Sequence, residues 1–190
     1  DAATSFRHAL FQTVSIASTT GFASSDFNLW PDFSRYVLLL LMFVGGCSGS
    51  TAGGMKVSRF VILLKVTWAE LRRTIHPRLV YSIKMGGRNV PPVVVGNVTR
   101  FFYLYMIVFS TLTLLISLTG LSMLDSMGII AACMSSVGPA FGIVGPTATY
   151  ADVSTFGRLV VIAAMILGRL EIFTLLIIMR PDFWRVKRNW

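Results

Sequence analysis

Long apolar stretches alternate with short polar segments along this chain. Residues 36–55, 101–124 and 159–179 are rich in aliphatic and aromatic side chains, and the first two contain no charged residue. A bilayer crossing needs about 20 such residues, so each stretch is long enough to span, although the second half of the first is rich in glycine. The third is interrupted by the polar sequence Gly168-Arg169-Leu170-Glu171.

Two shorter apolar segments, residues 2–18 and 129–134, are too short to cross. Each runs into a turn of small residues: Ser18, Thr19, Thr20 and Gly21 after the first, and Ser135, Ser136, Val137 and Gly138 after the second. A short helix followed by such a turn suits a re-entrant pore helix and its selectivity filter. An ordinary helix with a glycine C-cap is the alternative.

The two turns belong to an internal repeat, in which residues 18–23 align with residues 135–140. Each copy continues through a polar loop to an arginine that opens an apolar stretch and to a glycine ten residues later: Arg35 and Gly45 in the first copy, Arg158 and Gly168 in the second. We therefore predict an all-α membrane protein built from repeated units of outer helix, re-entrant pore helix with filter loop, and inner helix.

The repeat divides the chain into three expected parts. Residues 1–76 would form a unit that lacks its outer helix, and residues 93–190 a complete unit with a basic tail. Residues 77–92, which contain glycine, proline and several basic side chains, would form a cytoplasmic linker near the lipid headgroups. The missing outer helix of the first unit favours a truncated chain.

Glycine is concentrated where the first long apolar stretch would be expected to continue as a helix. The glycines concerned are Gly45, Gly46, Gly49, Gly53 and Gly54. Glycine costs about 1 kcal/mol against alanine in a helix interior, so this segment is predicted to unwind. Irregular backbone within a membrane is tolerated only where it is buried in protein or lines a water-filled cavity. We therefore expect a gating loop in a transport pathway.

The charges are few and unevenly placed. Of the residues, 54% are hydrophobic and 13% charged, and the formal net charge is +9. In a soluble chain this balance would suggest nucleic acid, but here the basic residues flank apolar stretches, as in the cytoplasmic segments of membrane proteins. We therefore expect a lipid bilayer, no nucleic acid and a cytoplasmic C-terminus. Acidic residues dominate the loops expected on the outer side of the membrane, where they would attract cations to the entrance.

The turns have the composition that a carbonyl filter needs. Such a filter replaces the hydration shell of an ion with backbone carbonyls. Gly21 and Gly138 reach positive φ without steric cost, which lets successive carbonyls point the same way. Neither turn contains a carboxylate, so a monovalent cation is favoured over a divalent one.

Arg169 is the second functional candidate. An arginine at the centre of a membrane helix costs about 2.5–3.5 kcal/mol on insertion scales and usually faces a cavity or a partner. The repeat aligns Arg169 with Gly46, at the depth of the glycine-rich segment, whose free carbonyls suit its five donors. We interpret Arg169 as part of a gate, and a purely structural clamp is the alternative.

Enzyme chemistry is not predicted. The glycine-rich segment lacks the Gly-Lys-Ser/Thr of a phosphate-binding loop, His8 and His76 form no metal cluster, and Cys47 and Cys133 suggest no disulfide framework. Two other classes remain open. A secondary transporter with broken helices would be expected to have inverted repeats, whereas a non-conducting membrane scaffold or assembly subunit would have no need for the two turns.

Thr19-Thr20-Gly21-Phe22, the glycine-rich segment from Gly45 to Lys56, and Gly168-Arg169-Leu170-Glu171 together resemble the Trk/Ktr potassium-uptake family, specifically its Trk-H-type membrane subunit. The resemblance implies four potassium-channel-like units around one pore, of which this chain would hold the third, without its outer helix, and the fourth. It matches Gly21 and Gly138 to filter glycines, the glycine-rich segment to the intramembrane gating loop, and Arg169 to an arginine that contacts this loop.

The same resemblance implies the ligands and partners. K⁺ would bind to backbone carbonyls of the two turns, with no covalently bound cofactor. The protein would be a homodimer in the bacterial cytoplasmic (inner) membrane. A cytosolic nucleotide-binding subunit would dock beneath the pore, so a nucleotide would act only through that regulatory partner.

Overall fold

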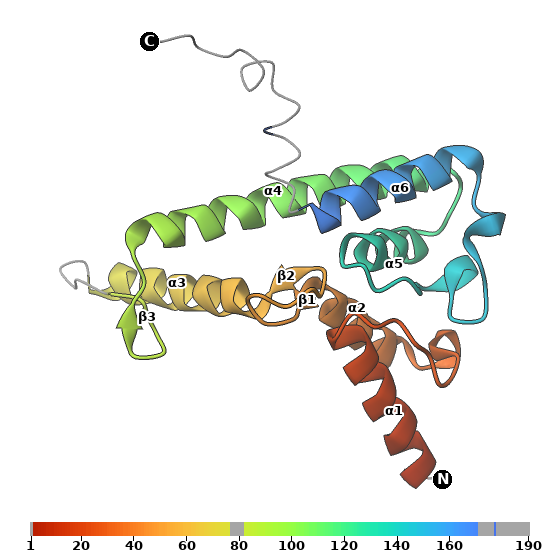
Figure 1. Cartoon of the computed structure of the whole chain (residues 1–190), viewed down its shortest axis with the longest axis horizontal. Helices are drawn as coiled ribbons and strands as arrows, with labels where there is room; N and C mark the ends of the chain where they lie inside the picture. The colour runs from red at the N-terminus through yellow and green to blue at the C-terminus, as the bar shows by residue number, and fades with distance from the viewer. Residues whose placement is uncertain (1, 77–81, 171–176, 178–190) are drawn as a thin grey trace.

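The structure of the chain is a computed structural model that describes residues 2–76, 82–170 and 177 (Figure 1). The α-helices in these residues are α1 (Ala2–Ala17), α2 (Asp32–Phe43), α3 (Val57–Ile75), α4 (Pro92–Ser117), α5 (Met123–Met134) and α6 (Thr155–Arg169). Short 3-10 helices are η1 (Phe27–Leu29), η2 (Gly142–Val144) and η3 (Tyr150–Asp152). Two-residue strands are β1 (Val44–Gly45), β2 (Met55–Lys56), β3 (Lys84–Met85) and β4 (Arg88–Asn89).

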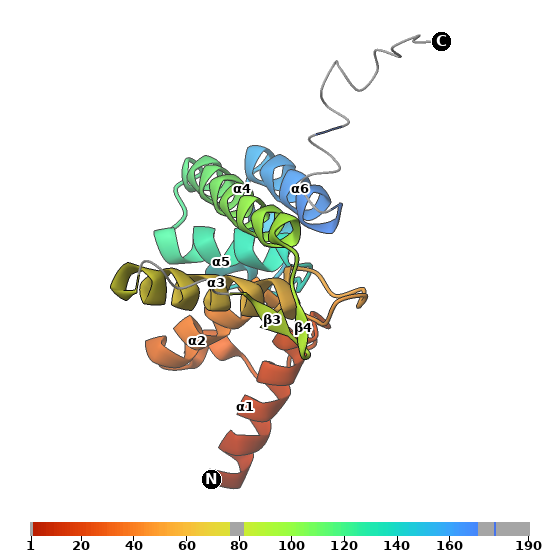
Figure 2. The ribbon, with the colours of Figure 1, turned by 90° about the vertical axis from the view of Figure 1, so that its left-hand side faces the viewer.

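The helix α5 lies at the centre of this arrangement. It runs between the α4–α6 pair and α2, while α1 projects from the side opposite α4 (Figures 1 and 2). Its residues from Ile129 to Met134 are each at most 1% exposed. A helix that is apolar on all faces is stable only when it is surrounded. The position of α5 therefore places the turn that follows it inside the molecule.

The glycine-rich segment unwinds, as predicted. The helix α2 ends at Phe43 and α3 begins at Val57, so residues 46–54, called the glycine loop below, leave the helical path. Strands β1 and β2 close this loop as a parallel pair, with Val44 opposite Met55 and Gly45 opposite Lys56. A Cβ on Gly45 would overlap the carbonyl oxygen of Gly53, so only glycine allows the two ends of the loop to approach this closely.

The two aligned segments contain elements in the same order. Helix α1, η1 and α2 follow one another in the first segment, and α5, η3 and α6 in the second, where η2 is additional. Asp26 and Thr149 occupy aligned positions before η1 and η3, and their side chains accept from the backbone N–H of Asn28 and Ala151. The reading of these segments as pore units remains a prediction.

The predicted span over residues 101–124 has the wrong boundaries. Helix α4 begins at Pro92, runs through the exposed Arg100 and ends at Ser117. A proline in the first turn of a helix lacks only an N–H that would have no partner there, so the prolines before residue 93 start the helix rather than delay it. Gly120, with φ +84°, forms the turn after its end. Among the described helices, α4 is the one long and apolar enough to cross a membrane.

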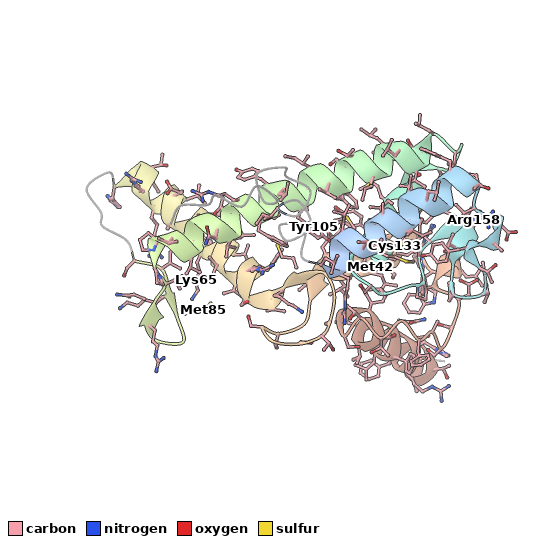
Figure 3. The ribbon with its side chains drawn as sticks, turned by 45° about the horizontal axis from the view of Figure 1, so that its top comes forward. Met42, Lys65, Met85, Tyr105, Cys133 and Arg158 are labelled. Carbon is pink, nitrogen blue, oxygen red and sulfur yellow. The ribbon has the colours of Figure 1, made fainter. Side chains whose placement is uncertain are left out.

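The expected linker contains structure. Strands β3 and β4 form an antiparallel hairpin, with Lys84 opposite Asn89. Lys65 on α3 donates through Nζ to the carbonyl of Lys84 at 2.6 Å, which holds the hairpin against α3. Figure 3 shows Lys65 and Met85 at this end of the molecule. Three expected parts lie outside the described residues: residues 77–81 of the linker, the basic tail, and, apart from residues 170 and 177, the portion of the third predicted span that follows Arg169.

Asn28 joins the two segments through their loops. Its Nδ2 donates to the carbonyl of Gly142 at 3.3 Å, and its Oδ1 accepts from the N–H of Gly142 at 3.0 Å. Beside it, the rings of Phe27 and Phe141 meet edge to face with centroids 5.5 Å apart. The side-chain amide of Asn28 therefore forms a reciprocal pair of hydrogen bonds with the backbone of Gly142, as two residues in paired antiparallel strands do.

Replacing Asn28 by alanine is expected to destabilise the contact between the two segments. The N–H of Gly142 would lose its partner, at a cost of about 1–3 kcal/mol, while the Gly142 carbonyl would keep only the N–H of Gly145. Thermal unfolding of the purified protein in detergent measures this as a lower midpoint. Asn89→Ala on the exposed hairpin is the control and should leave the midpoint unchanged. Equal midpoints for both variants would contradict the bridging role of Asn28.

Candidate functional site

The first turn, residues 18–21, ends α1 with a left-handed residue. Thr19 has φ +57°. Its N–H bonds to the carbonyl of Ile16 at 3.0 Å, and the N–H of Thr20 bonds to the carbonyl of Ser15 at 2.9 Å. These two bonds are those of a Schellman motif, which usually places glycine at the left-handed position. Here that position is a threonine, so the helix has a C-cap but its left-handed residue is not Gly21.

The second turn, residues 135–138, ends α5 in the same way. Ser136 also has φ +57°. Its N–H bonds to the carbonyl of Cys133 at 3.2 Å, and the N–H of Val137 bonds to the carbonyl of Ala132 at 2.9 Å. Positive φ is uncommon in residues with a side chain. Its presence at aligned positions of both turns indicates that the surrounding structure imposes it.

A glycine in the left-handed region follows each of these residues two positions later. Gly21 has φ +79° and Gly138 has φ +100°, whereas Thr20 and Val137 between them have negative φ. When the handedness alternates along a chain, successive peptide planes turn so that their carbonyls can face one side. Both turns therefore have a backbone that can present several oxygens to one ligand.

The two turns lie directly against each other. A Cβ on Gly21 would overlap the carbonyl oxygen of Val137 and would lie 3.2 Å from the ring of Pro139. A Cβ on Gly138 would meet no atom within 4 Å. The glycine of the first turn is thus needed for close approach, while that of the second borders open space.

The glycine loop contacts both turns. The N–H of Gly53 donates to Oγ1 of Thr19 at 3.3 Å. On its other side, a Cβ on Gly53 would overlap the carbonyl oxygen of Ser135, and one on Gly54 would lie 3.2 Å from the Ser135 hydroxyl. Gly46 packs within the loop against Ala52. A Cβ on Gly49, which has φ +87°, would meet no atom within 4 Å.

Two positively charged side chains donate hydrogen bonds to carbonyls of the loop. Arg169, the last residue of α6, donates to the carbonyl of Thr51 at 2.5 Å, so the expected contact with the loop is present. Lys56 donates through Nζ to the carbonyl of Ser50 at 2.7 Å and to that of Ala52. Three consecutive carbonyls are thus satisfied by two positive side chains. The sequence pattern did not single out Lys56, although its place at the end of the loop could have indicated this role.

A cavity of about 570 Å³ connects the second turn with Arg169. It lies between α5 and α6 and is lined by Ser136, Gly138, Met165, Ile166 and Arg169 among others. Its walls are mostly apolar, and Arg169 is the one charged residue among those that line it. In the part of the chain that the structure describes, no group of three histidine, cysteine or acidic side chains could hold a metal ion.

Side-chain hydroxyls hold the backbone that leaves each turn, and the sequence analysis did not identify them. The Ser15 hydroxyl donates to the carbonyl of Phe22 at 2.6 Å, and the Tyr150 hydroxyl donates to the carbonyl of Gly138 at 2.7 Å. Burial raises the pKa of the Tyr150 phenol, so the hydroxyl stays protonated and can donate at neutral pH. Comparing the loops of the two copies, where Tyr150 aligns with Phe27, could have drawn attention to it.

Comparison with known proteins finds close relatives. Residues 1–185 match the TrkH family, described as cation transport protein. The Trk system potassium uptake protein TrkH of Vibrio parahaemolyticus is 46% identical over 180 residues, which are 95% of this chain and 37% of the relative. That of Escherichia coli is 41% identical over 177 residues, 93% of this chain and 36% of the relative. The chain thus spans little more than a third of the length of these relatives.

A solved structure has the same fold. The crystal structure of the potassium transporter TrkH from Vibrio parahaemolyticus matches with a TM-score of 0.88 and 44% sequence identity. The match covers 97% of this chain and 39% of that chain.

The contact between the two turns predicts unequal effects of two alanine substitutions. Gly21→Ala and Gly138→Ala both place a side chain at positive φ, which costs about 1 kcal/mol. Gly21→Ala alone also forces a methyl group onto the Val137 carbonyl. We expect Gly21→Ala to lower the thermal unfolding midpoint clearly more than Gly138→Ala. Similar midpoints for the two variants would show that the turns are not in contact.

Proposed function

This chain belongs to the TrkH family of cation transport proteins, and from that premise we propose that it takes part in potassium uptake across the bacterial cytoplasmic membrane. Its relatives in Vibrio parahaemolyticus and Escherichia coli are named as potassium uptake proteins. In this proposal K⁺ passes through a channel-like pore, whose carbonyl selectivity filter includes the two turns and whose intramembrane gate is the glycine loop.

The observation that carries the filter is the shared backbone of the two turns. Ser18, Thr19, Thr20 and Gly21 align with Ser135, Ser136, Val137 and Gly138, and both runs have positive φ at their second and fourth residues. Carbonyls in such an arrangement can replace the hydration shell of K⁺, with further units completing the ring. The absence of carboxylates from the turns supports a monovalent ion.

The gate is supported by the position of the glycine loop. Its Gly53 lies against both turns, and its carbonyls bind Lys56 and Arg169. A fixed positive charge beside an ion path raises the energy of a cation there. We propose that the loop with its two cations obstructs the path below the filter, and that conduction requires the loop to move.

The assembly follows from the same family membership. We propose a homodimer whose C-terminus is cytoplasmic, with a cytosolic nucleotide-binding subunit that regulates the pore. The names of the relatives, which refer to a Trk system, support further components. The exposed basic surface of α3 and the β3–β4 hairpin supports a cytoplasmic docking face. K⁺ itself is the only ligand of the pore in this proposal, and no covalently bound cofactor is required.

The filter is tested by replacing a glycine that has room for a side chain. In Gly138→Ser the new side chain would meet no other atom at its Cβ, but it would be strained at a φ of +100°. The carbonyls of the turn should therefore rotate. We expect a severalfold fall in the ratio of rubidium to sodium uptake, measured with radioactive rubidium and sodium in liposomes that contain the full-length protein.

Gly120→Ser is the matched control, because Gly120 also has positive φ and free space but lies in the turn after α4. It should conduct as the unmodified protein does. An unmodified protein that takes up neither ion would support the scaffold alternative, and an unchanged ratio in Gly138→Ser would move the pathway away from this turn.

If the glycine loop is a gate, weakening its hydrogen bond with Arg169 should increase transport. Arg169→Gln removes the charge that holds the Thr51 carbonyl, so the loop should move more easily and resting rubidium uptake should rise. Arg158→Gln is the control, because Arg158 lies on the same helix at the end away from the loop (Figure 3). Equal resting uptake in both variants and the unmodified protein would leave Arg169 as a purely structural clamp.

A further inference from the structure

Tyr150 lies at a position where the two aligned segments differ by one hydroxyl group. It opens η3, and the aligned residue that opens η1 is Phe27. Both short helices are capped in the same way by the preceding side chain. Phe27 is buried and Tyr150 is half-buried against the same core. Both rings pack against this core, and the hydroxyl is a separate feature that needs its own explanation.

The hydroxyl of Tyr150 lies between the second turn and the helix before it. It donates to the carbonyl of Gly138 at 2.7 Å and lies 3.3 Å from the sulfur of Cys133 on α5. The ring reaches this place because η3 is anchored through Val153, which is 3% exposed and donates its N–H to the carbonyl of Tyr150 at 3.3 Å. The donor is therefore held in position by the fold.

The second turn lacks the support that α1 gives the first. In the first segment, Gln12 and Ser15 on α1 donate to backbone carbonyls beyond the turn, at 2.9 and 2.6 Å. The aligned residues on α5 are Ile129 and Ala132, which have no polar side-chain atom. Tyr150 supplies from the following loop a hydrogen bond of the kind that α5 cannot make.

The Gly138 carbonyl has particular need of such a bond. The next residue is Pro139, so the peptide between them has no N–H and its carbonyl is its only group that can form a conventional hydrogen bond. The ring of Pro139 fixes its own φ, so the orientation of this peptide plane is set through ψ of Gly138, which glycine leaves free. Among the residues that the structure describes, none other than Tyr150 donates a hydrogen bond to this carbonyl.

We infer that Tyr150 is a positioning residue for ion selectivity, which fixes the Gly138–Pro139 peptide and thereby the neighbouring carbonyl of Val137. The inference rests on the proposed function of the turns as a filter. A filter selects between ions through the number and geometry of its carbonyls, so a peptide that rotates freely reduces discrimination even when the fold is intact.

Tyr150→Phe tests this role, because it removes the hydroxyl and introduces the residue that the first segment already carries. We expect the ratio of rubidium to sodium uptake by the full-length protein in liposomes to fall about fivefold, the equivalent of one typical hydrogen bond. Tyr103→Phe is the matched control, because Tyr103 on α4 is 63% exposed and far from the turns in sequence. It should leave the ratio unchanged.

A second measurement separates positioning from stability. Bound K⁺ stabilises the folded protein in proportion to its affinity, so the thermal midpoint should rise with K⁺ concentration. In Tyr150→Phe the K⁺ concentration needed for the same rise in the midpoint should increase about fivefold. A lower midpoint without K⁺, combined with an unchanged uptake ratio and an unchanged K⁺ dependence, would overturn the inference and leave Tyr150 with a structural role.

The same experiments distinguish this inference from the proposed function. If the unmodified protein takes up rubidium selectively and Tyr150→Phe does so equally well, the filter proposal stands and the inference fails. If the unmodified protein takes up no rubidium, the transport proposal fails, and the K⁺ dependence of the thermal midpoint alone decides whether Tyr150 shapes an ion site.

Discussion

The structure depends on the close approach of backbone to backbone where the glycine loop meets the two turns. At Gly53 and at Gly21 a single methyl group would overlap a carbonyl oxygen of the second turn. Glycine loses more conformational freedom on folding than any other residue, and here that cost is offset by contacts that no other residue allows. These contacts set the height of the loop relative to the turns, and with it the position of every group that the loop presents.

The carbonyls of the glycine loop and the two basic side chains that bind them stabilise each other. Unwinding removes the helical partners of the loop carbonyls, and a carbonyl without a partner is costly away from water. A positive side chain in apolar surroundings is costly for the same reason. When Lys56 and Arg169 donate to three consecutive carbonyls, both costs are reduced together. The loop is held on this side by a few hydrogen bonds that a movement of α6 or α3 would break.

The two aligned segments have the same backbone at the turns but support it differently. Both place a hydroxyl residue and then a glycine at positive φ, with the same pair of capping hydrogen bonds. In the first segment the polar support comes from α1, and α1 is partly exposed. In the second it comes from η3, because α5 is enclosed by apolar neighbours. Burial of α5 therefore explains why its polar support comes from a different element.

The sequence by itself determined much of this protein. Its apolar stretches, its repeat and its glycines predicted the short helices, the turns and the break after α2, because these features depend on local backbone preferences. It also predicted that Arg169 meets the loop, since an isolated charge in an apolar stretch needs an acceptor at its own depth. It misplaced the ends of α4, where the prolines and Arg100 suggested a boundary that the helix passes through.

Only the tertiary structure decided how the turns are assembled. Threonine and serine, rather than glycine, occupy the left-handed caps, because packing and hydrogen bonds can outweigh a local preference of about 1 kcal/mol. The contact of Gly21 with Val137, the donors Lys56 and Tyr150, and the bridge at Asn28 each join residues through geometry that hydrophobic periodicity does not encode. Their positions follow from how the helices pack, and packing depends on all the side chains of the core at once.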